Sequence, residues 1–418
     1  MITDSAIPPL RRINAHTQTL LISNVGGAVL SVLLSAVIGR TLGETGLGTY
    51  ALALAWVFPL NLVVDFGLGT LLTRDVAATP TLAANYLHLI ALQRLVMGGA
   101  LLLLLIAATP LISPDLLLQR AITISAPMLI ILPFFGMFSA LLRAAGDMQA
   151  IAILNIGMLI AQLVITALVL AFGGDVIVAL AINVITSAGQ LAAAWAFSRR
   201  IRIFTPPATT RPIRLHFLLR SALPFAGAGI LAAVGSRLTL ILLEALTTTA
   251  DVGYFNAASR FTEAAKLVPN AFFGALLPAL AALVNDLPAL RRLFQGSQRR
   301  LLLYAVAAAV GIAGGAPVWI AVIYGDRFLP AVPTLIVLST GLIPTVLRAG
   351  RTLYWYACRR EATVNRITAA LLLVQIIVSL ALILPFGTVG AALALLVVDS
   401  IALLCLMRSP LRSLRDSR

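Results

Sequence analysis

The sequence has little charge, little cysteine and little histidine. Only 11% of its 418 residues are charged, whereas 60% are hydrophobic. A soluble globular domain carries about 25% charged residues, so this composition excludes that class and indicates a membrane protein. With two cysteines and three scattered histidines, neither a disulfide framework nor a metal centre is expected. We therefore expect no metal and no cofactor.

Patterns typical of enzyme active sites are also missing from the sequence. There is no GxxxxGK[ST] nucleotide-binding loop and no Ser/His/Asp combination with plausible spacing. The longest predicted external loop lies around residues 109–116 and contains neither histidine nor arginine. We therefore expect that the protein is not an enzyme.

Apolar runs of about 20 residues recur along the whole chain. Each is long enough to cross roughly 30 Å of hydrocarbon as a helix, and none shows the period of two that a membrane barrel requires. We therefore predict an all-α membrane protein with about 12 transmembrane helices. The expected spans are 18–38, 50–72, 86–108, 117–142, 150–172, 176–197, 218–243, 253–284, 301–324, 332–355, 367–386 and 388–407.

Basic residues outnumber acidic residues by 30 to 15. The basic residues are distributed unevenly between the two sides of the predicted spans. With the N-terminus inside, the even-numbered loops and both termini hold 21 of the 30, whereas the odd-numbered loops hold only Arg40, Arg120 and Arg327. This is the positive-inside pattern, which predicts that both termini are cytoplasmic. The positive charge then reflects topology and contact with anionic headgroups, and no nucleic-acid partner is expected.

The two halves of the chain resemble each other. An offset of 213 positions places Gln162 on Gln375, and an offset of 205 places Gly48 on Gly253. These matches indicate a duplicated six-helix unit. Because six is even, both copies start in the cytoplasm and the repeat is parallel, an architecture typical of alternating-access transporters.

A polar interruption separates the two copies. Residues 198–217 contain two adjacent prolines and five arginines, which break any helix and favour the cytoplasmic face. We predict an N-terminal six-helix lobe (1–197), a cytoplasmic linker (198–217) and a C-terminal six-helix lobe (218–418), with a central cavity between the lobes.

Three charges lie inside the eighth predicted span, where Arg260, Glu263 and Lys266 follow one another at steps of three. This spacing puts them on one broad helical face, roughly 10, 15 and 20 Å from the external side, and Arg237 is expected at the depth of Arg260 on the preceding span. Because a charge at the centre of a span costs about 2.5–3.5 kcal/mol, these side chains should face protein or water. Two interpretations are open: an internal ion-paired strut, or surplus cations that hold an anion such as phosphate.

Other ionisable residues are also expected within the membrane. Arg94, Arg348 and Asp399 lie roughly 10–12 Å from the cytoplasmic face, where pairing between helices and lining of a cavity are both open. Asp65 opens a DFGLG motif whose glycines permit close helix approach or a local break, so structural and functional roles are both open. Arg351 is close enough to the cytoplasmic face to snorkel, which favours a structural role.

Five short segments resemble the polysaccharide-biosynthesis flippases of the multidrug/oligosaccharidyl-lipid/polysaccharide exporter superfamily. They are RTLG (40–43), GTYA (48–51), DFGL (65–68), RDVA (74–77) and GYFNA (253–257). The resemblance extends over the whole chain. It implies a Wzx-type flippase that moves an undecaprenyl-diphosphate-linked oligosaccharide, an O-antigen or exopolysaccharide repeat unit, across the bacterial inner membrane by alternating access, with coupling to an ion gradient.

The resemblance also implies that the first two helices of each lobe line the central cavity. The candidate substrate-binding cations are then Arg237, Arg260 and Lys266. The candidate ion-coupling groups are Glu263 and Asp65. The candidate cavity-lining residues are Arg40, Arg94, Arg348 and Asp399. Ser236 stands where many relatives have an acidic residue, so coupling through that acid is not carried over.

The expected partners are the lipid-linked oligosaccharide, membrane lipids, glycosyltransferases and a polysaccharide polymerase. Two alternative functions are considered. A multidrug or metabolite exporter of the same superfamily would need a more apolar or acidic cavity for organic cations. A membrane-embedded polysaccharide polymerase or ligase would need a long external loop with catalytic arginines or histidines.

Overall fold

Helices account for the regular structure of the described residues. The computed structural model describes residues 10–80, 83–200, 215–284, 286–358 and 360–407, and among these residues no strand is found. Residues 201–214, most of the predicted cytoplasmic linker, lie outside the described residues. Eight described helical segments are long and apolar enough to cross a membrane, which confirms the predicted all-α multi-pass class.

Two of these eight segments are each interrupted by a glycine. The helix α1 (Leu10–Asp65) has non-helical backbone angles at Gly43, and the helix α14 (Glu361–Leu406) has them at Gly387. Both glycines have positive φ angles, 71° and 53°, which a residue without a Cβ adopts at little cost. They lie at the boundaries that the sequence predicts between spans one and two and between spans eleven and twelve.

The ninth predicted span is also divided in the structure. The helices α11 (Leu287–Gly314) and α12 (Ala316–Tyr324) meet at an angle of 66° and together count as a ninth candidate span. The helix α8 (Leu215–Leu246) is not among the eight. The count of twelve spans therefore remains a prediction.

The chain forms two compact units. Unit 1 consists of Met1–Leu34 and Trp56–Ala233, and unit 2 consists of Ser35–Ala55 and Val234–Arg418. The segment 35–55 of α1 thus groups with the second half of the chain, although the sequence prediction places it in the N-terminal lobe. The division into two six-helix lobes remains a prediction.

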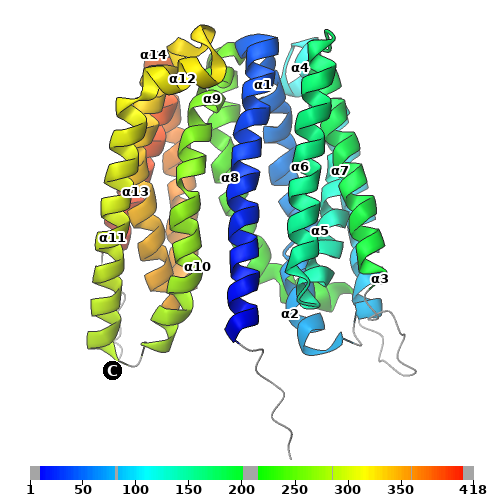
Figure 1. Cartoon of the computed structure of the whole chain (residues 1–418), viewed down its shortest axis with the longest axis vertical. Helices are drawn as coiled ribbons and strands as arrows, with labels where there is room; N and C mark the ends of the chain where they lie inside the picture. Colours follow the sequence, from blue (N-terminus) through cyan, green and yellow to red (C-terminus); the bar gives the residue numbers. More distant parts are fainter. Residues whose placement is uncertain (1–9, 81–82, 201–214, 285, 359, 408–418) are drawn as a thin grey trace, which may run out of the picture. The chain divides into compact units, whose positions relative to one another are not determined.

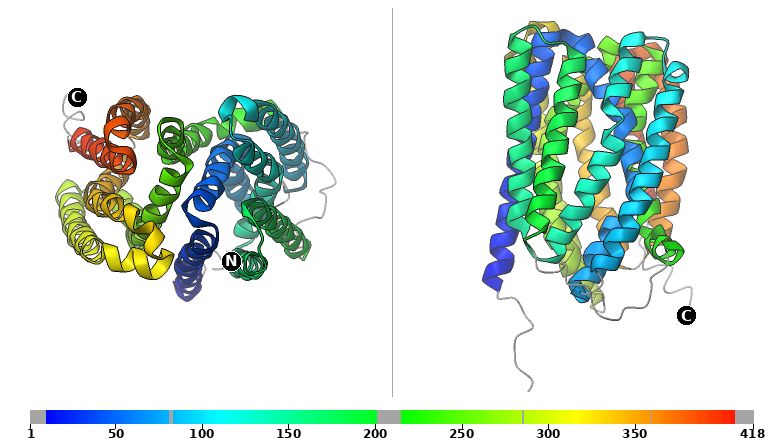
Figure 2. Two further views of the ribbon diagram at one scale, coloured as in Figure 1. Left: turned by 90° about the horizontal axis from the view of Figure 1, so that it is seen from above. Right: turned by 90° about the vertical axis from the view of Figure 1, so that its right-hand side faces the viewer.

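In unit 1, several helices start at an aspartate. Asp115, Asp147 and Asp175 each accept a hydrogen bond from a backbone N–H two or three residues later, which satisfies an otherwise orphan donor at the helix start. The helices α5, α6 and α7 lie side by side (Figure 2). The helices of this unit after α1 are α2 (Leu68–Ala78), α3 (Ala83–Ile112), α4 (Leu116–Ser125), α5 (Met128–Ala144), α6 (Met148–Ala171) and α7 (Val176–Ser198).

In unit 2, α13 is the helix around which others pack. It lies beside both α11 and α14 (Figure 1). A capping box between Thr248 and Asp251 fixes the start of α9. The remaining elements are α9 (Thr249–Ala265), α10 (Leu267–Ala282), the short 3₁₀ helix η3 (Asp326–Ala331) and α13 (Val332–Ala357).

Two glycines of unit 2 allow backbone contact between α1 and α9. A Cβ atom on Gly48 would lie 1.9 Å from the carbonyl oxygen of Thr249, and one on Gly253 would lie 2.0 Å from that of Glu44. No side chain fits at either position without a backbone shift. The offset of 205 relates Gly48 to Gly253 and Glu44 to Thr249, so the contact is reciprocal between the two repeat-related segments.

Candidate functional site

An ion-paired cluster lies between α8 and α9 in unit 2. Nη1 of Arg260 lies 3.3 Å from Oε2 of Glu263, one turn further along α9. Arg237 of α8 lies within electrostatic range of Glu263 and of Arg260. The Glu263 side chain is 49% exposed and that of Arg260 is 23% exposed, so the described residues cover the pair only in part.

Lys266, the third predicted cation, occupies the junction between two helices. The helix α9 ends at Ala265 and α10 begins at Leu267, and Lys266 lies between them, half-buried. Among the described residues Lys266 forms no ion pair. Of the two bases that the sequence places near Glu263, the structure pairs the acid with Arg260.

Tyr324 at the end of α12 supports the cluster. Its hydroxyl donates a hydrogen bond of 3.0 Å to Oγ of Ser35, and its ring packs edge-on against Phe261 with a centroid distance of 6.3 Å. The side chain is buried and lies within electrostatic range of Arg260 and Glu263. Nothing in the sequence singles out Tyr324, because aromatic residues near the ends of spans are common.

A second ion pair lies in unit 1, where Asp65 ends α1. Arg94 of α3 is completely buried, and it donates hydrogen bonds to the Asp65 carboxylate and to the carbonyl oxygen of Pro133. The chain breaks directly after Asp65, because Phe66 and Gly67 both have positive φ angles, 47° and 71°. The local break that the DFGLG motif permits is therefore present, and it leaves the carboxylate facing Arg94.

A third ion pair connects α13 and α14. Nε of Arg348 lies 2.9 Å from Oδ1 of Asp399, and the Thr345 hydroxyl donates a hydrogen bond to the other carboxylate oxygen. Both charged side chains are partly buried. The sequence leaves both pairing and cavity lining open for Arg94, Arg348 and Asp399. In the structure each of the three belongs to a carboxylate–arginine pair.

Arg40 contacts the end of a helix, and among the described residues it forms no ion pair with the cluster. Its guanidinium donates hydrogen bonds to the carbonyl oxygens of Val322 and of Ile323, the latter at 2.9 Å from Nε. These oxygens belong to the last turn of α12, where carbonyls lack helical partners and a cation is favourable. The contacts favour a structural role for Arg40.

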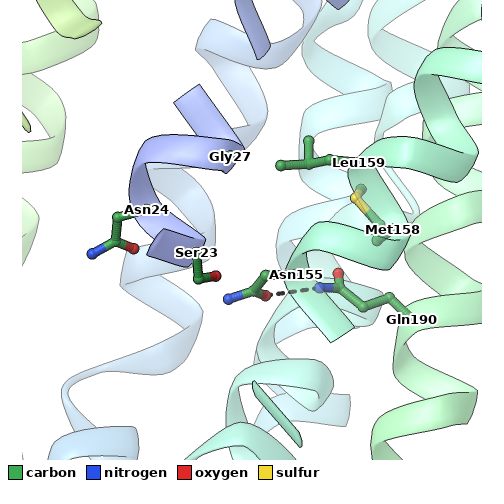
Figure 3. Close-up of a pocket in the computed structure, with 7 residues that line it drawn as sticks. All are labelled: Ser23, Asn24, Gly27, Asn155, Met158, Leu159 and Gln190. Atoms are coloured by element: carbon green, nitrogen blue, oxygen red, sulfur yellow. Dashed lines mark hydrogen bonds between the residues drawn. The ribbon is translucent and has the colours of Figure 1, made fainter. Parts of the chain in front are cut away.

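Unit 1 also contains a neutral polar pocket of about 320 Å³ between α1, α6 and α7 (Figure 3). Nε2 of Gln190 donates hydrogen bonds to Oδ1 of Asn155 at 3.0 Å and to the carbonyl oxygen of Leu154 at 3.3 Å. Hydroxyl and amide groups of this kind bind uncharged polar ligands. The lining residues are Ser23, Asn24, Gly27, Asn155, Met158, Leu159 and Gln190, none of them charged.

Solved structures with the same arrangement of helices are membrane transporters. The lipid II flippase MurJ, in an inward closed conformation, matches with a TM-score of 0.75 and 16% identity, covering 94% of this chain and 87% of that chain. An inward-facing MATE multidrug transporter matches with a TM-score of 0.74 and 12% identity over 93% and 96%. The Vibrio cholerae MATE transporter VcmN matches with a TM-score of 0.69 and 15% identity over 97% of both chains. At these identities the similarity shows the fold, that of a multi-pass membrane transporter.

The family of the chain follows from its sequence. Residues 15–284, more than half of the chain, match the family described as polysaccharide biosynthesis protein, and the chain belongs to that family. No curated protein matches the sequence. The resemblance inferred from the short motifs is therefore confirmed.

Proposed function

We propose that this protein is a flippase that translocates an undecaprenyl-diphosphate-linked oligosaccharide across the bacterial inner membrane, with both termini in the cytoplasm. The observation that carries the proposal is the open cluster on α8 and α9. Arg237, Arg260 and Lys266 provide three formal positive charges and Glu263 provides one negative charge. The resulting excess of two positive charges matches an anionic ligand.

A lipid diphosphate fits the chemistry of this cluster. Guanidinium groups bind phosphate oxygens through short charge-assisted hydrogen bonds. Such bonds gain strength in surroundings from which water is partly excluded. An organic cation, the substrate expected for the alternative exporter, would be repelled by the same charge.

Glu263 is the first candidate for ion coupling. Its carboxylate is half-exposed and already holds Arg260, so a proton or a cation that binds Glu263 would release Arg260 to a phosphate. Asp65 is the second candidate, but it compensates the completely buried Arg94. Protonation of Asp65 would leave a buried charge without its partner, which is costly.

The neutral pocket of unit 1 offers a site for the sugar portion of such a substrate. Sugars present many hydroxyl groups that both donate and accept hydrogen bonds, and the amides of Asn155 and Gln190 offer the matching groups. The pocket is not charged, so it would not distinguish the diphosphate. We assign it to neutral hydroxyl groups.

Complementation tests this proposal. The wild-type chain is expressed in a strain that lacks its own O-unit flippase, together with Arg260→Ala, Glu263→Gln and the exposed control Arg120→Ala, and surface polysaccharide is measured at matched membrane levels. We expect wild type and Arg120→Ala to restore export and the two cluster variants to reduce it at least tenfold. Full export by both cluster variants would contradict the assigned site. A well-inserted wild type that exports organic cations but no polysaccharide would support the alternative exporter.

A further inference from the structure

A second basic pocket, of about 280 Å³, lies in unit 2 away from α8 and α9. It is formed by the first turns of α11, the last turns of α13 and the end of α14, and it is lined by Arg291, Phe294, Gln295, Arg351, Tyr354 and Met407. Neither the ion-paired cluster nor the transport proposal uses any of these residues.

The position of Arg351 in this pocket is fixed by stacking. Its guanidinium lies over the ring of Phe294, 5.6 Å from the centroid, and that ring stacks on Tyr354 at 4.4 Å with an angle of 26°. Nη1 of Arg351 also donates a hydrogen bond of 3.4 Å to the carbonyl oxygen of Met407. Phe294 and Tyr354 are both buried, so the arginine rests on a rigid aromatic base.

The two arginines of the pocket differ from three other arginines described above. Arg94, Arg260 and Arg348 each have a carboxylate partner. Among the described residues neither Arg291 nor Arg351 forms an ion pair. The pocket therefore holds two positive charges that no described acidic residue compensates, a composition suited to a phosphate group.

The surroundings of the pocket indicate where such a phosphate comes from. Arg291 and Arg292 lie at the start of α11, on the face that the arginine distribution predicts to be cytoplasmic. Exposed apolar side chains lie beside the charges, namely Leu287 and Met407. Basic pockets between membrane helices on the cytoplasmic side bind anionic lipid headgroups, and the adjacent apolar surface suits acyl chains rather than a soluble ligand.

We propose that this pocket binds the phosphate of an anionic glycerophospholipid of the cytoplasmic leaflet, with Arg291 and Arg351 as its two cationic ligands. The inference does not depend on the proposed transport function, because it concerns other residues and a lipid that is not transported. It also gives a binding role to Arg351, for which the sequence alone favours a structural one.

Native mass spectrometry of the full-length protein in a neutral detergent tests this inference. Phosphatidylglycerol is titrated against wild type, Arg291→Ala, Arg351→Ala and Arg292→Ala, and phosphatidylcholine is titrated in parallel. Arg292 is the matched control, because it is exposed on the same turn but does not line the pocket. We expect Arg291→Ala and Arg351→Ala each to weaken phosphatidylglycerol binding about tenfold, as loss of one charge-assisted hydrogen bond predicts, and Arg292→Ala to bind like wild type.

Three outcomes would overturn the inference. Phosphatidylglycerol could bind equally to the wild type and both pocket variants, or phosphatidylcholine could bind as tightly as phosphatidylglycerol. Complete displacement of the lipid by glycerol 1-phosphate at equal concentration would make this a site for soluble phosphates. Since Arg291 is exposed and forms no ion pair with any described residue, its replacement should leave the fold intact. A thermal melt of each variant without lipid checks this. Arg260→Ala should leave this binding unchanged, which separates a failure here from a failure of the transport proposal.

Discussion

Units 1 and 2 differ in how far their intramembrane charged side chains are compensated by partners of opposite charge. In unit 1 the charged groups Asp65 and Arg94 compensate each other, and the polar pocket is neutral. Unit 2 contains a compensated pair as well, Arg348 with Asp399, but it adds a cluster with more cations than acids. A compensated pair needs no ligand, whereas an open cluster with excess charge favours one. The pairs can therefore be purely structural, whereas we propose anion binding for the cluster and binding of neutral groups for the pocket.

The largest expected effect concerns the pair in unit 1. Asp65→Ala leaves Arg94 buried without its carboxylate, so we expect the free energy of unfolding to fall by about 3–5 kcal/mol. Glu263→Gln changes a half-exposed pair, so it should lower the free energy of unfolding by no more than about 1 kcal/mol. Denaturant unfolding of the purified variants measures both values. Equal losses of unfolding free energy in the two variants would mean that both ion pairs contribute to stability to the same extent.

A double variant sharpens the same comparison. Asp65→Ala combined with Arg94→Met removes the unpaired charge, so most of the lost stability should return. If the double variant is as unstable as Asp65→Ala alone, the loss comes from the break at Phe66 and Gly67 rather than from the charge.

A smaller effect is expected at the backbone contact of unit 2. Gly253→Ala places a Cβ 2.0 Å from the carbonyl oxygen of Glu44, so helix separation should cost about 1–3 kcal/mol. Gly189 in α7 of unit 1 is the control, because a Cβ there meets nothing within 4 Å, and Gly189→Ala should gain up to about 1 kcal/mol from helix propensity. Thermal melts of both variants and wild type measure these changes in stability. A Gly253→Ala protein as stable as wild type would argue against a tight crossing of α1 and α9.

Some of this arrangement could be predicted from the sequence. The step of three between Arg260 and Glu263 predicts their contact, because helical neighbours depend only on local geometry. The equal expected depths of Arg237 and Arg260 predict that α8 and α9 contribute to one cluster. The repeat offset of 205 relates Gly48 to Gly253. It does not predict that these glycines allow contact between α1 and α9.

Other features depend on tertiary packing and could not be derived locally. Asp65 and Arg94 are 29 residues apart on different helices, so no local spacing indicates their pairing. The neutral pocket combines Ser23, Asn155 and Gln190 from three helices, and isolated amides and hydroxyls give no periodic pattern. Residues 35–55 group with unit 2, where Gly48 lies against Thr249 and Ser35 accepts a hydrogen bond from Tyr324. Helix propensity does not encode such contacts.

The smallest effect is expected at the neutral pocket. Asn155→Ala removes one neutral hydrogen-bonding group, so the apparent affinity for a lipid-linked oligosaccharide should fall about two- to tenfold. Binding of the glycosylated lipid to purified protein, measured beside Leu159→Ala as an apolar variant of the same pocket, checks this. A larger loss for Leu159→Ala than for Asn155→Ala would mean that the pocket binds apolar groups.

The most direct test of the account uses undecaprenyl diphosphate without any sugar. Its affinity is measured for purified wild type, Arg260→Ala and Asn155→Ala, with thermal melts as a control for folding. We predict that Arg260→Ala weakens binding at least tenfold, because a charge-assisted contact is lost, and that Asn155→Ala binds like wild type. Equal affinity of Arg260→Ala and wild type, or equal losses in both variants, would contradict the assignment of the diphosphate to the cluster of unit 2.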